Sequence, residues 1–73
     1  MPDIKFEIIK KFGILSKSNK GWVKELNLIR WNDREPKYDI REWSPDGKTM
    51  SKGVTLSKEE LAALRELLNK MDM

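Results

Sequence analysis

Apolar residues recur at every second position near the start of the chain. Over residues 4–16 they alternate with charged residues, and Lys10 interrupts the pattern. A period of two places alternate side chains on opposite faces of a strand, so this segment predicts a long β-strand with one buried face. Gly13 falls inside the segment, and an isolated glycine in a strand is typical of a β-bulge. The alternating apolar residues are Ile4, Phe6, Ile8, Phe12 and Ile14.

Three further segments carry strand signals. Residues 22–31 and 37–43 are rich in β-branched and aromatic residues, and residues 52–56 form a shorter apolar run. Ser, Asn, Asp, Pro and Gly are concentrated between these segments, which is typical of tight turns. The turns are expected at residues 17–21, 32–36 and 44–47.

The side-chain directions follow from parity in the third strand but not in the second. In residues 22–31 the alternation is poor, and a bulge near Asn27 would reconcile it. In residues 37–43 we expect Tyr38 and Ile40 to face the core, which turns the odd-numbered residues outward. The residues expected to point outward are Lys37, Asp39, Arg41 and Trp43.

A capping box marks the start of one helix. Ser57 is followed three residues later by Glu60, a spacing that satisfies two free backbone amides reciprocally. The helix should run to about residue 70 and lay an apolar stripe on the sheet or on a second subunit. The sequence therefore predicts an α+β fold in one domain over residues 1–73: a four-stranded sheet followed by a C-terminal helix (ββββα). The candidate dimer-interface residues are Leu61, Leu64, Leu67, Leu68 and Met71.

Length and composition exclude much of the catalytic repertoire. The chain has 73 residues and contains neither histidine nor cysteine, so it lacks the usual general base, thiol nucleophile and zinc ligands. A domain this small buries only about 60% of its unfolded surface, which favours a homodimer. No segment predicts a membrane span or a signal peptide, and we expect a cytoplasmic protein.

Carboxylates are the remaining candidates for catalysis or metal binding. We disfavour both roles, because Arg34 and Lys37 are ready partners for the acidic residues of the turn. We therefore expect no enzymatic activity, no metal and no cofactor. The carboxylates considered are Asp33, Glu35, Asp39 and Glu42.

Basic and aromatic residues are interleaved in the strand half of the chain. Lys and Arg number 15 against 12 Asp and Glu, and three tryptophans lie at strand ends near basic residues. Cations neutralise phosphates and flat rings stack on unpaired bases, so this combination favours a single-stranded nucleic acid. The lysines could instead only protect strand edges, and Trp22 could be a core residue. The candidate binding residues are Lys17, Lys20, Trp22, Lys24, Trp31, Lys37, Arg41, Trp43 and Lys52.

The order of these motifs resembles the transcriptional positive cofactor 4 (PC4) family. A Tyr-Asp-Ile-Arg-Glu-Trp strand over residues 38–43 precedes a Pro-Asp-Gly turn and a Lys-Gly-Val-Thr-Leu strand over residues 52–56. The chain is most similar to the bacterial YdbC-type members, through Lys-Gly-Trp at 20–22, Trp-Asn-Asp at 31–33 and the Lys-Tyr-Asp-Ile-Arg run. The resemblance covers roughly residues 5–70.

The resemblance implies a homodimer with helices at its interface and a strongly curved antiparallel sheet. It also implies non-sequence-specific binding of single-stranded DNA on the concave sheet faces. We expect this binding to act in transcription, replication or repair, and the sequence does not say which. Arg41 and Lys52 match basic residues of the family's strands, and Trp31 lies near the position of a family aromatic residue. Trp43 stands where the family has tyrosine, and Ser44 replaces the next aromatic residue.

Two other functions remain open. One is a protein-interaction module, similar to a transcription coactivator, whose basic sheet meets an acidic partner. The other is RNA binding, because nothing in the sequence distinguishes a site for the 2′-hydroxyl. Duplex DNA is expected to bind more weakly than single strands, since it hides its base faces.

Overall fold

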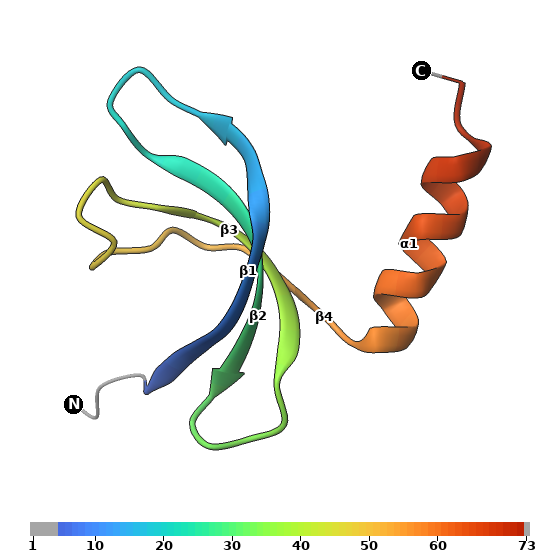
Figure 1. Ribbon diagram of the computed structural model, residues 1–73, viewed down its shortest axis with the longest axis horizontal. Helices are drawn as coiled ribbons and strands as arrows, with labels where there is room; N and C mark the ends of the chain where they lie inside the picture. Colours follow the sequence, from blue (N-terminus) through green and yellow to red (C-terminus); the bar gives the residue numbers. More distant parts are fainter. Residues whose placement is uncertain (1–4, 73) are drawn as a thin grey trace.

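Four strands and one helix make up the computed structural model, which describes residues 5–72 (Figure 1). The strands form one antiparallel sheet in the order β1-β2-β3-β4, and the helix follows the last strand. This confirms the predicted ββββα order and the α+β class. The elements are β1 (Phe6–Lys17), β2 (Val23–Trp31), β3 (Lys37–Trp43), β4 (Val54–Leu56) and α1 (Lys58–Lys70). The expected strand residue Ile4 lies outside the described residues.

The turns close where the polar clusters predict them. The Gly21 amide donates to the Ser18 carbonyl at 3.0 Å, and Gly21 has a φ of +88° that a side chain would strain. Asn32 and Asp33 adopt φ values of 49° and 62° between β2 and β3, a conformation that these residue types tolerate. Short polar turns therefore connect the first three strands directly.

Strand β1 contains three register shifts against β2. They lie between Ile8 and Lys10, between Lys11 and Gly13, and between Ile14 and Ser16. Each shift leaves one extra residue on β1, so the face on which the following side chains lie changes. The bulge expected near Gly13 is confirmed. The single buried face expected for the alternating residues is wrong, because Phe12 and Ile14 lie on different faces and both are exposed.

Strand β2 is regular against β3, from Val23 opposite Trp43 to Ile29 opposite Lys37. The bulge expected near Asn27 is therefore wrong. The poor alternation of β2 has another cause, since Asn27 itself is fully buried beside Ile29. Because the buried Asn27 is polar, the apolar residues of β2 do not follow a period of two, although the strand itself is regular.

The sheet curls strongly, and we call the side toward which it curls the inner face. Phe6 pairs with Trp31 at one end of β2, yet its ring centroid also lies 5.5 Å from that of Trp43, which pairs with the other end. Bulges bend a strand and increase its twist, which explains how distant ends of the sheet meet. The concave side therefore serves as the core of the chain.

The expected orientation of β3 is reversed. Asp39 is fully buried and Trp43 is 3% exposed on the inner face, whereas Tyr38 and Ile40 lie half-buried on the opposite, outer face. The odd-numbered and even-numbered residues of β3 do lie on opposite faces, as predicted. The face that is buried, however, is the one that carries the odd-numbered residues. Curvature is the reason: the curl packs Phe6 against Trp43, so part of the concave side is buried without a second layer.

Helix α1 lies beyond the outer face, next to β3 and β4 (Figure 1). Its capping box is confirmed: the Glu60 amide donates to Ser57 Oγ at 3.1 Å and the Ser57 amide to Glu60 Oε1 at 2.8 Å. None of the described helical residues is buried, and Leu67 is 60% exposed. Within residues 5–72, no helix has the length and apolar character needed to cross a membrane.

Candidate nucleic-acid interface

Curvature gathers aromatic, basic and acidic side chains on the inner face. The pairing register places alternate residues of β2 and β3 there, together with β1 residues selected by its bulges. Five of the predicted binding residues lie on this face: Lys17, Trp31, Lys37, Arg41 and Trp43. The inner face is therefore the candidate interface.

Arg41 is held by a buried carboxylate. Its Nε and Nη2 donate to the two carboxylate oxygens of Asp39 at 2.6 and 2.8 Å, and Thr55 Oγ1 donates to Asp39 Oδ2 at 3.1 Å. The Arg41 Nη1 atom lies 3.4 Å from the Ser51 carbonyl oxygen, and the side chain is 14% exposed. Because Asp39 already neutralises it, this arrangement does not support the expected role of Arg41 as a free phosphate ligand.

Trp31 rests against that ion pair. The Arg41 guanidinium carbon lies 4.7 Å from the Trp31 ring centroid, within the range of a cation–π interaction. Phe6 packs on the same indole with centroids 5.8 Å apart and a tilt of 43°. Trp31 is nevertheless only half-buried, so part of its side chain stays accessible. Of the three tryptophans, it is the one on the inner face that combines exposure with a fixed position.

Trp43 occupies the core instead of the surface. Its ring packs on Phe6, and its indole N–H has no hydrogen-bond acceptor among the described residues. A ring that is 3% exposed offers no free face on which a base could stack. The expectation that Trp43 points outward for stacking is therefore wrong in this chain.

Trp22 lies in the connection between β1 and β2. Its backbone amide donates to Ser18 Oγ at 3.1 Å, which ties the residue to the turn, and its side chain is half-buried. Lys17 and Lys20 are exposed at the same end of the sheet. This end therefore combines a partly accessible indole with two exposed lysines.

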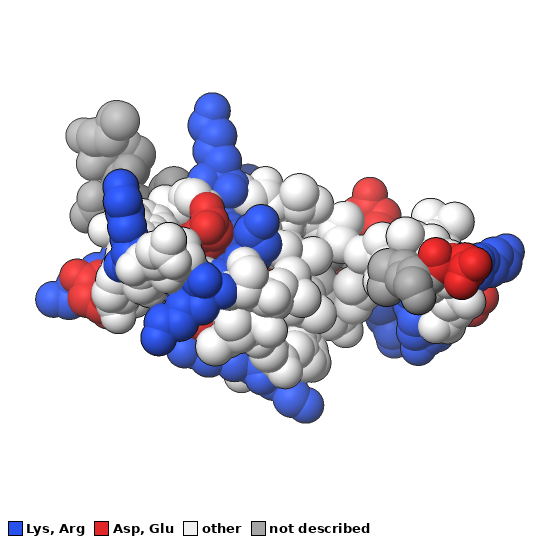
Figure 2. All heavy atoms as spheres, turned by 90° about the horizontal axis from the view of Figure 1, so that it is seen from above, with Lys and Arg blue, Asp and Glu red and all other residues white. Residues whose placement is uncertain are grey.

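Lys24 and Lys52 form a separate basic group. Lys24 pairs with Ser16 and Glu42 in register with the outer-face residues, and it lines a shallow pocket together with Lys52. Figure 2 shows Lys and Arg side chains distributed around the sheet half of the molecule, while both signs of charge mix at the helix. The structure thus does not bring all of the predicted basic residues to one face.

Lys11 and Glu25 are not among the binding residues that the sequence predicts. Both line a cavity on the inner face, where Lys11 is opposite Asn27 in the register. Strict alternation along β1 places Lys11 on the same face as the other odd-numbered, charged residues. The bulge after Ile8 moves Lys11 to the inner face instead. Gly13 was the available signal of irregularity, but one glycine does not predict three shifts.

A tight turn after β3 forms another wall of this cavity. The Gly47 amide donates to the Ser44 carbonyl at 2.9 Å, which confirms the predicted turn at residues 44–47. Ser44 Oγ donates to Asp46 Oδ1 at 2.6 Å, and that bond, followed by one from the Lys48 amide, lowers the pKa of Asp46 below its ordinary value of 3.8. These bonds hold the Asp46 carboxylate in the turn.

The described part of the chain contains no group of three or more acidic, His or Cys side chains arranged to hold a metal ion. Asp33 forms an exposed pair with Lys5 at 3.3 Å, and Asp39 is bound to Arg41. The inner face offers ion pairing, hydrogen bonding and aromatic contact.

Two comparisons with known proteins bear on this surface. A family model described as Transcriptional Coactivator p15 (PC4) matches residues 18–67. An uncharacterized protein of Treponema pallidum (strain Nichols) is 52% identical over 71 residues, which cover 97% of this chain and 84% of the relative. The family match includes β2, β3, β4 and most of α1.

Proposed function

Since the chain belongs to the transcriptional coactivator p15 (PC4) family, we propose that it is a non-enzymatic, dimeric protein that binds single-stranded DNA. PC4 is a non-enzymatic DNA-binding family, and membership suggests nucleic-acid binding or a coactivator-like role. The proposal assigns this chain to single strands, largely independent of sequence, in transcription, replication or repair. The closer similarity to YdbC-type members stays a prediction.

The position of Trp31 is the observation that carries the proposal. Its indole is half-buried on a concave face and contacts both Arg41 and Phe6. A fixed, partly accessible ring can stack on an unpaired base, which contributes about 1–3 kcal/mol and tolerates any base. Duplex DNA keeps its base faces stacked, so the same ring favours single strands.

Exposed lysines around the inner face would bind phosphates. Lys17 and Lys20 lie at the β1–β2 end, and Lys37 lies at the start of β3. We propose these three as the primary phosphate ligands and Trp22 as a second stacking residue. Lys24 and Lys52, on the other side of the sheet, would contribute as a separate and weaker group. We propose that Arg41 and Trp43 do not contact DNA directly. Arg41 holds the Trp31 ring in place, and Trp43 packs in the core below the inner face.

The apolar stripe of α1 supports the proposed homodimer. Leu67 and Leu68 are exposed on the helix, Met71 is exposed at its C-cap, and Val54 and Phe12 are exposed on strands of the sheet. A second copy that covers these side chains would remove apolar area from water at about 25 cal/mol per Å². Leu61 and Leu64, which are half-buried, would complete the interface.

Tryptophan fluorescence during titration with an oligo-dT of about 20 nucleotides tests the proposal. We expect quenching by the single strand, a smaller response to the matching duplex, and an affinity that falls with salt by about 0.7 log units per neutralised phosphate for each tenfold rise. Replacing Trp31 with Phe keeps the packing and reports its share of the signal. An absence of binding at low salt would reject the proposal.

The family description as a transcriptional coactivator favours one second candidate. In that function the basic surface would contact an acidic protein partner, and we expect binding to oligonucleotides to be weak and independent of their length. Titration with oligonucleotides of increasing length separates the two candidates. A parallel titration with oligo-U tests the RNA alternative, because only RNA carries the 2′-hydroxyl.

A further inference from the structure

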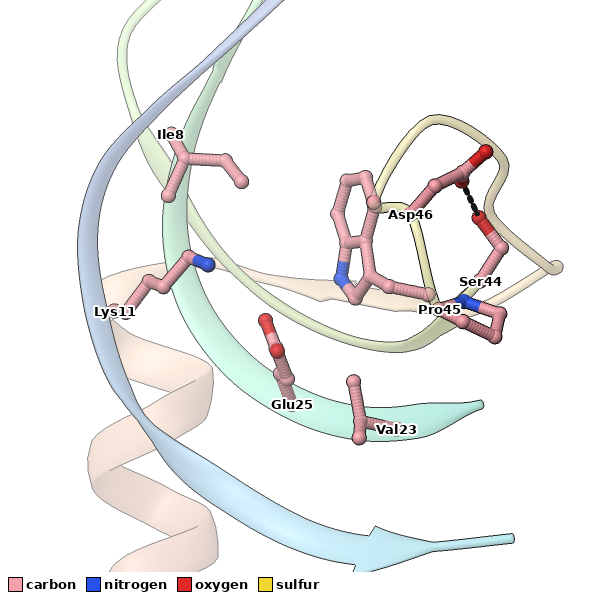
Figure 3. Close-up of a pocket in the computed structure, with 9 residues that line it drawn as sticks. Ile8, Lys11, Val23, Glu25, Ser44, Pro45 and Asp46 are labelled. Carbon is pink, nitrogen blue, oxygen red and sulfur yellow. Dashed lines mark hydrogen bonds between the residues drawn. The ribbon is translucent and has the colours of Figure 1, made fainter. Parts of the chain in front are cut away.

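A cavity of about 270 Å³ opens on the inner face between β1, β2 and the turn after β3. Ile8, Val23 and Pro45 supply apolar wall, and Lys11 and Glu25 supply charged groups (Figure 3). Trp43 also lines the cavity. Its volume is slightly below the range of about 300–1,000 Å³ typical of sites for drug-sized ligands. The cavity is therefore suited to a single ring system.

Two opposite charges point into this cavity without neutralising each other. Figure 3 shows the Lys11 and Glu25 side chains directed into the same space, and no salt bridge joins them in the described structure. Glu25 Oε1 accepts one hydrogen bond from Asn27 Nδ2 at 3.1 Å. Its Oε2 accepts none from residues 5–72, which leaves acceptor capacity toward the cavity.

Trp43 adds an unsatisfied donor to the cavity wall. Its indole N–H is buried, and none of the described residues accepts from it. Burying a donor without an acceptor costs free energy, because the N–H loses its hydrogen bond to water and gains none in return. Because this N–H is closed off from solvent, it is not counted among the groups that face a ligand.

The negative charge of Glu25 determines which part of a nucleotide can bind in this cavity. A phosphate seated beside Glu25 would place two negative charges together, which is unfavourable. A base carries no net charge, its faces fit apolar walls, and its edge offers donors to a carboxylate. The site is therefore more suitable for a base than for the DNA backbone.

Guanine is the base whose edge matches these groups best. Its Watson–Crick edge presents two neighbouring donors, N1–H and N2–H, beside the O6 acceptor. Thymine presents one N–H, and adenine and cytosine each present an amino group next to an acceptor nitrogen. We propose that the cavity binds one guanine of the single strand, with Glu25 accepting from N1–H and N2–H and Lys11 donating to O6. This inference rests on the proposed function and adds one base-selective position to a surface otherwise tolerant of sequence.

The test compares an oligo-dT of about 20 nucleotides with the same strand carrying one central guanine. We expect the guanine strand to bind about tenfold more tightly, within the range of one bidentate base contact. Inosine lacks the N2 amino group and should keep only about threefold of the preference. E25Q should reduce the ratio of the two affinities to about one while oligo-dT still binds.

E42Q is the matched control. Glu42 is a half-buried carboxylate on the neighbouring strand, in register with the outer-face residues, and its replacement changes the net charge by the same amount. E42Q should keep the guanine preference of the unmodified protein. Loss of the preference in E42Q but not in E25Q would overturn the assignment to this cavity.

The outcomes separate this inference from the proposed function. Equal affinities for the two strands, with oligo-dT binding intact, would overturn the guanine site and leave the proposed function standing. No binding of oligo-dT would overturn the proposed function and the inference with it. Binding of guanosine monophosphate as tight as that of the strand would overturn a strand site in favour of a free-nucleotide site.

Discussion

The buried carboxylate of Asp39 accepts two hydrogen bonds from the guanidinium of Arg41, which in turn covers one side of Trp31. The planar guanidinium suits both contacts, because its fork matches a carboxylate and its face matches an aromatic ring. A basic residue that sequence reasoning assigns to phosphate binding thus becomes a structural support. The position of the partly accessible Trp31 therefore depends on the ion pair between Asp39 and Arg41.

Replacing Asp39 with Asn should destabilise the protein by about 3–5 kcal/mol, because it leaves the Arg41 charge buried with no opposite charge. Urea unfolding followed by circular dichroism measures the change. Asp33→Asn is the control, since that carboxylate forms an exposed pair with Lys5 and should matter by less than about 1 kcal/mol. Equal effects of the two substitutions would contradict the role given to the buried pair.

Replacing Trp31 with Ala should weaken binding of single-stranded DNA by about 1–3 kcal/mol, the value of one stacked base. Fluorescence anisotropy of a labelled oligo-dT measures the affinity. Thermal unfolding of the same variant should retain a cooperative transition, because Trp31 is only half-buried. An unchanged affinity in the folded variant would remove Trp31 from the interface.

Replacing Trp43 with Ala should act on stability, with a loss of about 3–5 kcal/mol from the cavity left in the core. The indole is 3% exposed and packs on Phe6, so its removal opens the inside of the curled sheet. Denaturant unfolding is the appropriate measurement. A variant as stable as the unmodified protein would show that the ring is not part of the core.

Replacing Gly53 with Ala should destabilise the chain by about 1–3 kcal/mol through overpacking. An added Cβ would overlap the Arg41 Cβ and the Ile40 carbonyl oxygen, where β4 approaches β3 closely. Gly13→Ala is a matched control, since a Cβ there meets nothing within 4 Å. Comparable melting temperatures for the two variants would contradict this close approach.

Replacing Leu67 with Asp should convert the proposed dimer into a monomer, because a charge would enter the apolar interface of α1. Sedimentation equilibrium measures the mass directly. Leu15→Asp is a control of equal exposure, 61% against 60% for Leu67, on a different element. A dimer that persists in Leu67→Asp would place the interface elsewhere.

Local signals in the sequence were enough for the order of elements. The capping box at Ser57 and Glu60 forms as expected, and the turn at residues 44–47 closes as its composition predicts. Helix α1 ends at Lys70, as the sequence predicts. These features depend on residues a few positions apart, so they can be predicted from the sequence alone.

Long-range geometry decided which side chains the sheet hides. Three bulges in β1 and the curl of the sheet bury Asp39 and Trp43, which parity alone had turned outward. The same curl brings Phe6 to Trp43 and Arg41 to Trp31. A period of two assigns residues to two faces but contains no information on which face is concave. Burial depends on curvature and on contacts between distant strand ends, and these exist only in the folded chain.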